Sequence, residues 1–247
     1  PDMVLSAAGA VDHDELVSLA RQKFGAINSE PAAPDLDARY SGGEKLLNKD
    51  LMEAQVLIGF EGRPYKAKDY YAIQILASVL GGGMSSRLFQ EIREKHGLCY
   101  AIYSFHWAFS DTGLFGIHAA TSHEDLGALM PMIADELVSA AHTITEDEVA
   151  RSRAQIRAGL MMALESPAAR AGQIARQILV HGRVLAPDEI SAKIEAVTAA
   201  DIREAAYNTF VGTTPTLTAI GPINGIMTAD ELAARLQQAP VRQAASM

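Results

Sequence analysis

The sequence has few cysteines, no basic run and no long apolar run, which are the features that disulfides, nucleic-acid binding and membrane spans require. It contains one cysteine, Cys99, so neither an internal disulfide nor a thiolate zinc site is expected. Its 21 Lys and Arg are outnumbered by 30 Asp and Glu, and no basic run offers the positive stripe that phosphate groups bind. No run of about 18 apolar residues occurs, which leaves no candidate transmembrane helix. Nucleic acid and membrane are therefore excluded as partners, and the cytoplasm is the default compartment, with the periplasm also compatible.

What is present is the composition of a folded globular chain. Hydrophobic residues make up 49% and charged residues 21% of the 247 positions, which excludes general disorder. A chain of this length forms one large domain, or one domain with additional pieces. It begins with Pro1 and has no basic-then-apolar leader, so it is expected to be a fragment of a longer polypeptide.

Hydrophobic periodicity predicts an α+β fold. Alternating patterns predict strands at residues 3–11, 44–49, 53–61, 98–109, 114–120 and 216–222. Helical patterns and capping signals predict helices at residues 12–24, 66–80, 85–96, 124–142, 146–165, 167–181, 188–197, 199–210 and 228–238. Because the strands group early and a helical run precedes one late strand, we expect a mixed, largely antiparallel sheet with helices packed on one face. The segment at 98–109 is apolar on both alternating faces, which is typical of a central strand.

A strand that ends in Gly, followed by a helix containing Asp-Glu-Leu, occurs twice, at residues 5–16 and 217–232. Chance similarity between two amphipathic units is one explanation. The other is that the first copy ends a preceding homologous domain, which would also account for the Pro-, Ser- and Gly-rich stretch after it. This second explanation predicts the terminal strand and helix of a preceding domain at 1–24, an interdomain linker at 25–43, the main domain at 44–238 and a tail at 239–247. Having lost its own sheet, the first segment would offer an open strand edge to another chain, including a second copy in a homodimer.

The histidine and glycine patterns do not indicate a cofactor site. None of the seven histidines belongs to an H-E-x-x-H or H-x-x-E-H motif. His106 and His118 are expected to face each other across a hairpin as a packing contact rather than as a ligand pair. The glycines at 81–83 match neither the dinucleotide fingerprint nor the P-loop, and they predict a flexible joint between two helices. Cys99 is expected to be a buried, unreactive thiol.

Arg93 and Tyr100 form the strongest candidate for chemistry. The predicted helix at 85–96 places Arg93 near its end, and the chain then reverses so that Tyr100 follows on the next strand. Both side chains can donate hydrogen bonds to a carbonyl or an oxyanion, which is the polar assistance that attack on a peptide bond requires. The alternative is structural. In that case Arg93 is solvated or paired with Glu91 or Glu94, and Tyr100 packs as an ordinary strand aromatic.

Residues 83–100 closely resemble the C-terminal half of the mitochondrial processing peptidase and insulinase (pitrilysin) family of zinc metallopeptidases. The family pattern is a Ser-x-Arg-Leu helix followed by Arg-Glu-x-x-Gly-Leu-x-Tyr, and the sequence matches every position. The resemblance extends along the chain. The opening strand and helix resemble the end of the family's N-terminal domain, the Pro-rich stretch resembles its linker, and residues 216–221 resemble the last strand of its second domain.

The resemblance implies a processing-peptidase-like (metallohydrolase-like) fold in which two homologous α+β domains close around an unfolded peptide substrate. In the family, the N-terminal half binds zinc through H-x-x-E-H and a distal Glu. The C-terminal half contributes an Arg and a Tyr, here Arg93 and Tyr100, which hold the substrate carbonyl and stabilise the tetrahedral intermediate. The zinc ligands have no counterpart in this sequence. The resemblance therefore implies no cofactor in this chain, zinc in the missing N-terminal half, and no activity from this chain alone.

Two functions remain open on these grounds. The first is the substrate-enclosing half of a zinc-dependent endopeptidase, which needs an N-terminal zinc-binding half or a homologous subunit as its partner. The second is a noncatalytic scaffold or partner subunit of the same family. Retention of both Arg93 and Tyr100 favours the first function, because a scaffold needs neither side chain.

Overall fold

The computed structural model describes residues 3–27 and 37–238. The chain divides into two compact units. One unit comprises Pro1–Asp37 and Arg157–Ser191, and the other comprises Ala38–Ile156 and Ala192–Met247. The second unit contains the sheet and both of the candidate site residues. The predicted boundaries at residues 24, 43 and 238 stay predictions, and the tail at 239–247 lies outside the described residues.

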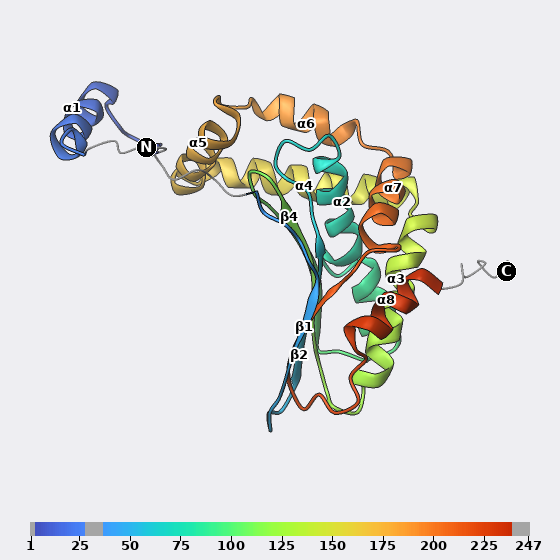
Figure 1. Cartoon of the computed structure of the whole chain (residues 1–247). Coiled ribbons are helices and arrows are strands. Elements are labelled where there is room, and N and C mark those ends of the chain that lie inside the picture. The colour runs from blue at the N-terminus through green and yellow to red at the C-terminus, as the bar shows by residue number, and fades with distance from the viewer. Residues whose placement is uncertain (1–2, 28–36, 239–247) are drawn as a thin grey trace. The chain divides into compact units, whose positions relative to one another are not determined.

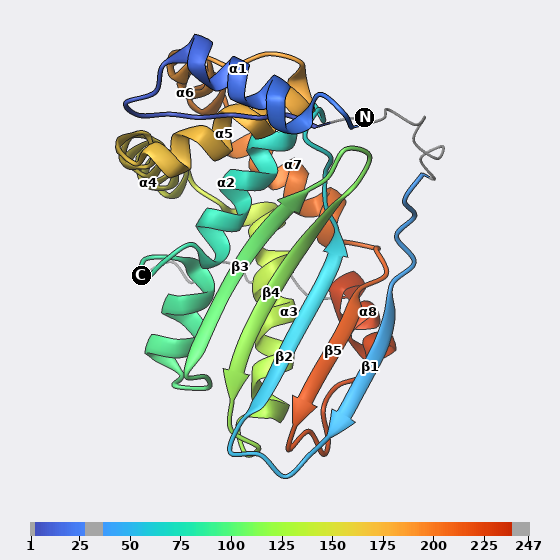
Figure 2. The same ribbon diagram turned by 90° about the vertical axis from the view of Figure 1, so that its left-hand side faces the viewer.

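The second unit is built on a five-stranded sheet with the order β1-β5-β2-β4-β3, which Figure 2 shows face on. The strands are β1 (Gly43–Asn48), β2 (Ala54–Glu61), β3 (Ala101–Ala108), β4 (Gly113–Thr121) and β5 (Thr216–Gly221). β1 runs parallel to β5, and the other three pairings are antiparallel. The predicted α+β class with a mixed, largely antiparallel sheet is therefore confirmed.

Helices cover one face of this sheet, as predicted (Figure 1). They are α2 (Tyr70–Gly81), α3 (Leu126–Thr143), α7 (Ala199–Phe210) and α8 (Ala229–Gln238). The core lies between the two layers, where three phenylalanine rings are fully buried. The ring of Phe210 on α7 meets those of Phe60 and Phe115 edge on, at centroid distances of 5.0 Å and 5.2 Å. Such contacts add to the free energy gained by removing the rings from water.

β3 lies at the edge of the sheet, so the prediction of a central strand is wrong. One face of β3 packs on the helix layer, where the hydroxyl of Ser104 donates to the carbonyl of Ala77 on α2 at 2.7 Å. The other face leaves Tyr103 and Trp107 exposed, at 46% and 57%. The strand is apolar on both sides because its open face carries aromatic rings, and this pattern cannot be distinguished from a doubly buried strand by sequence alone.

The central helices follow their local signals closely. The predicted bounds of α4 (Glu146–Glu165), α5 (Pro167–His181) and α7 agree with the structure. α5 begins behind Ser166, whose side chain accepts from a backbone amide, and ends at Gly182, which has a left-handed φ of 70°. α6 (Pro187–Glu195) completes this run of helices.

The N-terminal segment has a helix but no strand. α1 (His13–Phe24) begins at Asp12, whose carboxylate accepts from the Glu15 amide at 2.9 Å, as the capping pattern predicts. The strand predicted at 3–11 is not formed, because a strand requires a hydrogen-bonded neighbour and the described residues supply none. The segment buries little: no residue of α1 is buried. Six of its large apolar side chains are exposed by about half or more: Met3, Leu5, Val11, Leu19, Phe24 and Ile27.

Candidate functional site

The helix that carries Arg93 differs from the one predicted at 85–96. Residues 84–86 form a turn, and the main part is a π-helix, η1 (Phe89–Lys95). Near the end of this helix, the ring nitrogen Nδ1 of His96 donates to the backbone carbonyl of Glu91 at 2.8 Å. π-helical turns are rare and are often found at functional sites.

Arg93 lies on η1 with its guanidinium over an aromatic ring. The guanidinium carbon is 4.6 Å from the ring centroid of Phe89, one turn earlier, which is a cation–π contact. Glu91 instead pairs with Lys95 at 2.6 Å. Within residues 3–27 and 37–238, Arg93 makes no ion pair. Its five donors therefore remain available to an incoming acceptor.

Tyr100 is held by its backbone and exposed at its side chain. Its amide donates to the carbonyl of Ala120 at 2.8 Å, which ties it to the end of β4. The side chain is 74% exposed, so the alternative in which it packs as a strand aromatic does not describe it. No described group hydrogen-bonds its hydroxyl. The phenol can therefore donate to a ligand without first breaking an internal bond.

The chain between these two residues is fixed at several points. Gly97 adopts a left-handed φ of 67° and donates to the carbonyl of Arg93 at 3.1 Å, which ends the helix as predicted. The next amide, that of Leu98, donates to Ile92, and the hydroxyl of Thr121 donates back to the carbonyl of Leu98 at 2.6 Å. Arg93 and Tyr100 thus stand on either side of a short, well-anchored reversal at one end of β3, and no hydrogen bond joins their side chains.

Cys99, between them, is unsuited to nucleophilic chemistry. It is 7% exposed, and burial raises the pKa of its thiol to about 11, against an opposing effect of the Arg93 charge. At neutral pH the side chain is therefore a thiol and not the reactive thiolate.

The most extensive polar cluster near the candidate site is centred on Arg87, which belongs to the sequence motif but received no predicted role. Its Nε and one Nη donate to the two carboxylate oxygens of Glu148 at 2.6 Å and 2.9 Å. The same guanidinium also reaches Glu136 and Thr143. The only sequence signal for this cluster was the capping box of α4, Thr145-x-x-Glu148, which accounts for a carboxylate at that helix start.

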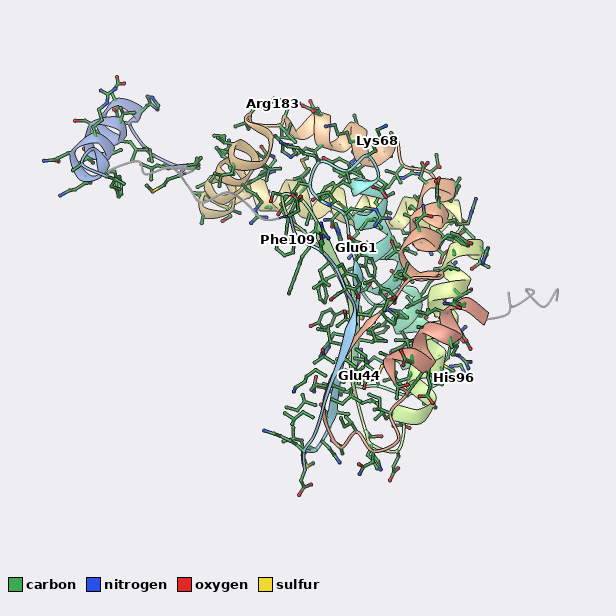
Figure 3. The ribbon with its side chains drawn as sticks, viewed as in Figure 1. Glu44, Glu61, Lys68, His96, Phe109 and Arg183 are labelled. Atoms are coloured by element: carbon green, nitrogen blue, oxygen red, sulfur yellow. The ribbon has the colours of Figure 1, made fainter. Side chains whose placement is uncertain are left out.

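The face of the sheet opposite the helices carries a row of aromatic side chains along β3. Tyr103, Phe105 and Trp107 alternate along the strand, with ring centroids 6.2 Å and 4.5 Å apart. Phe105 lies over Gly116 of β4, where an added Cβ would come within 2.2 Å of its ring. Phe109 lies just beyond the strand, at the end of the sheet labelled in Figure 3, and is 49% exposed. This row begins close to Tyr100 in the chain and presents an apolar surface.

The expected contact between His106 and His118 is wrong, because the strand register places them on opposite faces. His106 is opposite Phe115, and His118 is opposite Tyr103. His106 is buried on the helix side and accepts from the Arg63 amide at 2.9 Å. Burial lowers the pKa of its imidazole to about 4.

Two of the three glycines at 81–83 are explained by close packing. A Cβ on Gly81 would lie 2.2 Å from the Ser104 amide nitrogen, and one on Gly82 would lie 2.7 Å from Ser78. The chain therefore turns tightly at the end of α2, and the predicted flexibility of this joint stays a prediction.

Zinc does not fit the side chains that the structure describes. Within residues 3–27 and 37–238, no group of three or more His, Cys, Asp and Glu is arranged to hold a metal ion. Over the same residues, no helix combines the length and the apolar character needed to cross a bilayer.

Comparisons with known proteins cover most of the chain. The family model described as "Peptidase M16 inactive domain" matches residues 1–156. A Rickettsia felis protein named "Uncharacterized zinc protease" is 39% identical over 222 residues, which are 90% of this chain and 54% of that protein. A Schizosaccharomyces pombe protein named "Probable mitochondrial-processing peptidase subunit beta" is 32% identical over 245 residues, or 91% and 52% of the two chains. The chain thus spans about half the length of these relatives.

A solved structure gives the same fold. One chain of complex III2 from Candida albicans, with Inz-5 bound, superposes with a TM-score of 0.82 over 92% of this chain and 57% of that chain. The sequence identity is 22%, so this similarity bears on the fold alone.

Proposed function

The chain belongs to the M16 peptidase family, and on that basis we propose that it is the C-terminal, substrate-enclosing half of a zinc-dependent endopeptidase. The observation that carries the proposal is the state of the two motif residues: Arg93 has no ion pair among the described residues, and Tyr100 is 74% exposed. A scaffold would have no reason to keep both donors unengaged. The zinc, and the water that it activates, belong to a separate half or a homologous subunit.

In this function the chain contributes hydrogen bonds and enclosure. Arg93 and Tyr100 donate to the oxygen of the scissile carbonyl, whose negative charge grows as the bond is attacked. The aromatic row of Tyr103, Phe105 and Trp107 supplies an apolar wall that holds peptide side chains and excludes water. Without a metal-binding half the chain binds peptide but does not cleave it.

The N-terminal segment is where a partner half would attach. Residues 5–11 and 217–223 follow one pattern, and in the second copy Leu217 and Ala219 on β5 are buried to within 2%. In the first copy Leu5 is 55% exposed. We therefore assign residues 1–24 to the terminal strand and helix of a preceding homologous domain, with residues 3–11 joining the sheet of that domain or of a second copy of the chain. The single buried cysteine supports the cytoplasm as the compartment, with the periplasm also compatible.

A noncatalytic partner subunit is the second candidate, and the family model's description as an inactive domain fits it as well as it fits the first. The two candidates differ in what they require of Tyr100. Catalysis requires the hydroxyl, whereas a subunit that only supports an assembly requires nothing beyond the ring.

The experiment is peptide hydrolysis by this chain joined with a zinc-binding half. The chain alone should hold well under one zinc per molecule and should cleave nothing. In the joined enzyme, Tyr100→Phe and Arg93→Ala should each lower kcat by about 10² to 10³, with zinc content and melting temperature unchanged. Tyr207→Phe is the matched control, because it removes another exposed hydroxyl, on α7, and should leave kcat unchanged. Normal turnover of Tyr100→Phe would reject the catalytic assignment and favour the noncatalytic subunit.

A further inference from the structure

Arg87 uses every hydrogen-bond donor of its guanidinium within the protein. Nε donates to Glu148 at 2.6 Å, and one Nη donates to the other oxygen of that carboxylate at 2.9 Å and to the backbone carbonyl of Thr143 at 2.9 Å. The second Nη donates to the hydroxyl of Thr143 at 2.8 Å and to Glu136 at 3.3 Å. Five contacts account for the five N–H groups of the fork. The side chain is 14% exposed, so no donor remains for a ligand.

These bonds join three elements at one point. Thr143 is the last residue of α3, and Glu148 lies in the first turn of α4, where it also accepts from the Thr145 amide at 2.8 Å. Arg87 itself stands two residues before η1. The guanidinium therefore fastens the start of the segment that carries Arg93 to the corner between α3 and α4. We call Arg87, Glu148 and Thr143 the helix clamp.

The segment from Arg87 to Tyr100 is anchored at both ends. At its start, the helix clamp holds the backbone, and the hydroxyl of Ser86 donates to the carbonyl of Gly83 at 2.6 Å. At its end, the hydroxyl of Thr121 and the carbonyl of Ala120 hold the chain on β4. The π-helical turns lie between these anchors. Because i→i+5 winding is a marginal conformation, the orientation of Arg93 depends on where the two ends are fixed.

We propose that Arg87 is a positioning residue, whose helix clamp fixes η1 so that Arg93 meets the substrate carbonyl. The inference rests on the function proposed above. A displacement of about 1 Å at a catalytic group can cost about 10²-fold in rate, so a remote anchor of this kind has a measurable kinetic effect. Arg87 itself touches no substrate.

The test is Arg87→Lys in the joined two-half enzyme. Lysine keeps the charge and one bond to Glu148 but loses the planar fork, so it cannot hold Glu148 and Thr143 together. We expect kcat to fall by about 10-fold or more while KM for the peptide stays within about twofold, because the lost interaction acts in the transition state. Thr143→Val, which removes one of the five bonds, should give a smaller fall in the same direction and serves if Arg87→Lys does not fold.

The control is Arg153→Lys. Arg153 is 17% exposed, close to the value for Arg87, and it bonds Glu146 and the Val197 carbonyl, away from η1. Its substitution should lower the melting temperature without lowering kcat. Equal losses of kcat from Arg87→Lys and Arg153→Lys would overturn the inference, because general loosening of the domain would then explain both.

A double-mutant cycle with Arg93→Ala separates the inference from the proposed function. If Arg87 acts through Arg93, Arg87→Lys lowers kcat in the wild-type background but has no further effect once Arg93 is gone. Equal effects in both backgrounds overturn the inference and leave the proposed function intact. A full rate for Arg93→Ala alone overturns the proposed function, and the inference with it.

Discussion

The guanidinium of Arg87 and the carboxylate of Glu148 form a two-bond pair that joins positions 61 residues apart in the chain. Burial is the largest single influence on the pKa of each group and favours its neutral form, but the hydrogen bonds and opposite charges around the pair together outweigh it. They hold the pKa of Glu148 below and that of Arg87 above its ordinary value. The pair therefore stays charged at neutral pH. Removal of either partner leaves the other as an unpaired charge in a poorly hydrated position.

We expect Glu148→Gln to destabilise the chain. The side-chain amide oxygen of glutamine can still accept from the Thr145 backbone N–H, so the start of α4 keeps its cap. Arg87, however, loses its main counter-charge. Loss of one partner from a fully buried pair costs about 3 to 5 kcal/mol, and partial exposure lowers our expectation here to about 2 kcal/mol. Urea unfolding followed by circular dichroism measures the change in free energy.

Glu231→Gln is the matched control for this substitution. Glu231 forms the same capping box with Thr228 at the start of α8. The bonds of that box involve Thr228 only, whereas the box of Glu148 is joined by the Arg87 guanidinium. Its replacement should change the urea midpoint only slightly. Equal destabilisation by both variants would show that the cap, and not the ion pair, carries the stability.

His106 should make stability depend on pH between about 4 and 6.5. Burial lowers the pKa of its imidazole from 6.5 to about 4, so within that window the unfolded chain binds a proton that the folded chain does not. The contribution of neutral His106 to the free energy of unfolding is fully present above pH 6.5 and is lost as the pH falls towards 4. A shift of this size corresponds to about 3 kcal/mol.

The measurement is the free energy of unfolding at several pH values for the wild type and for His106→Gln. Glutamine can still accept from the Arg63 amide, but it does not titrate. The difference between the two stability profiles isolates the histidine from the carboxylates that also protonate in acid. A constant difference between pH 7 and pH 4 would contradict the assignment.

Sequence signals predicted those elements whose determinants are local. The bounds of α4, α5 and α7 agree with their predictions because each helix is started by a capping residue within its own sequence, such as Ser166. Strand placement depends on distant partners. For this reason β3 was predicted at the centre of the sheet and residues 3–11 were predicted to form a strand.

The candidate site shows the same limit. The motif indicated Arg93 and Tyr100, because their residue types suit the binding of a carbonyl oxygen. It contained Arg87 without revealing its role, since Glu136, Thr143 and Glu148 lie 49 to 61 residues further along the chain. Only the fold, which brings the corner between α3 and α4 against the start of η1, places these groups together.

Gly81→Ala should destabilise the domain, whereas Gly83→Ala should not. A Cβ on Gly81 would lie 2.2 Å from the Ser104 amide nitrogen, so α2 and β3 would have to move apart. Overpacking of this kind costs about 1 to 3 kcal/mol. A Cβ on Gly83 would meet only the Gln155 amide end, at 3.5 Å, and should change stability by less than about 0.5 kcal/mol. Thermal unfolding compares the two variants. Equal melting temperatures would favour the flexible joint that the sequence predicts over close packing at Gly81.

Trp107 should report peptide binding at the aromatic row. It is the only tryptophan in the chain and is 57% exposed, on the open face of the sheet. An unstructured peptide rich in aromatic residues should shield the indole from water, shift its emission to shorter wavelength and reduce quenching by acrylamide. A Gly/Ser peptide of equal length should do neither, because it offers no apolar side chain to the row.

Two tyrosines of similar exposure locate the peptide. Tyr103 lies on the row and is 46% exposed, whereas Tyr207 lies on α7 and is 50% exposed. Tyr103→Ser should weaken the response of Trp107, because it removes a neighbouring apolar contact, and Tyr207→Ser should leave the response unchanged. If the emission ignored the aromatic peptide, or if both variants weakened the response equally, the open face would not be the surface that encloses substrate. The contribution of this half would then be confined to Arg93 and Tyr100.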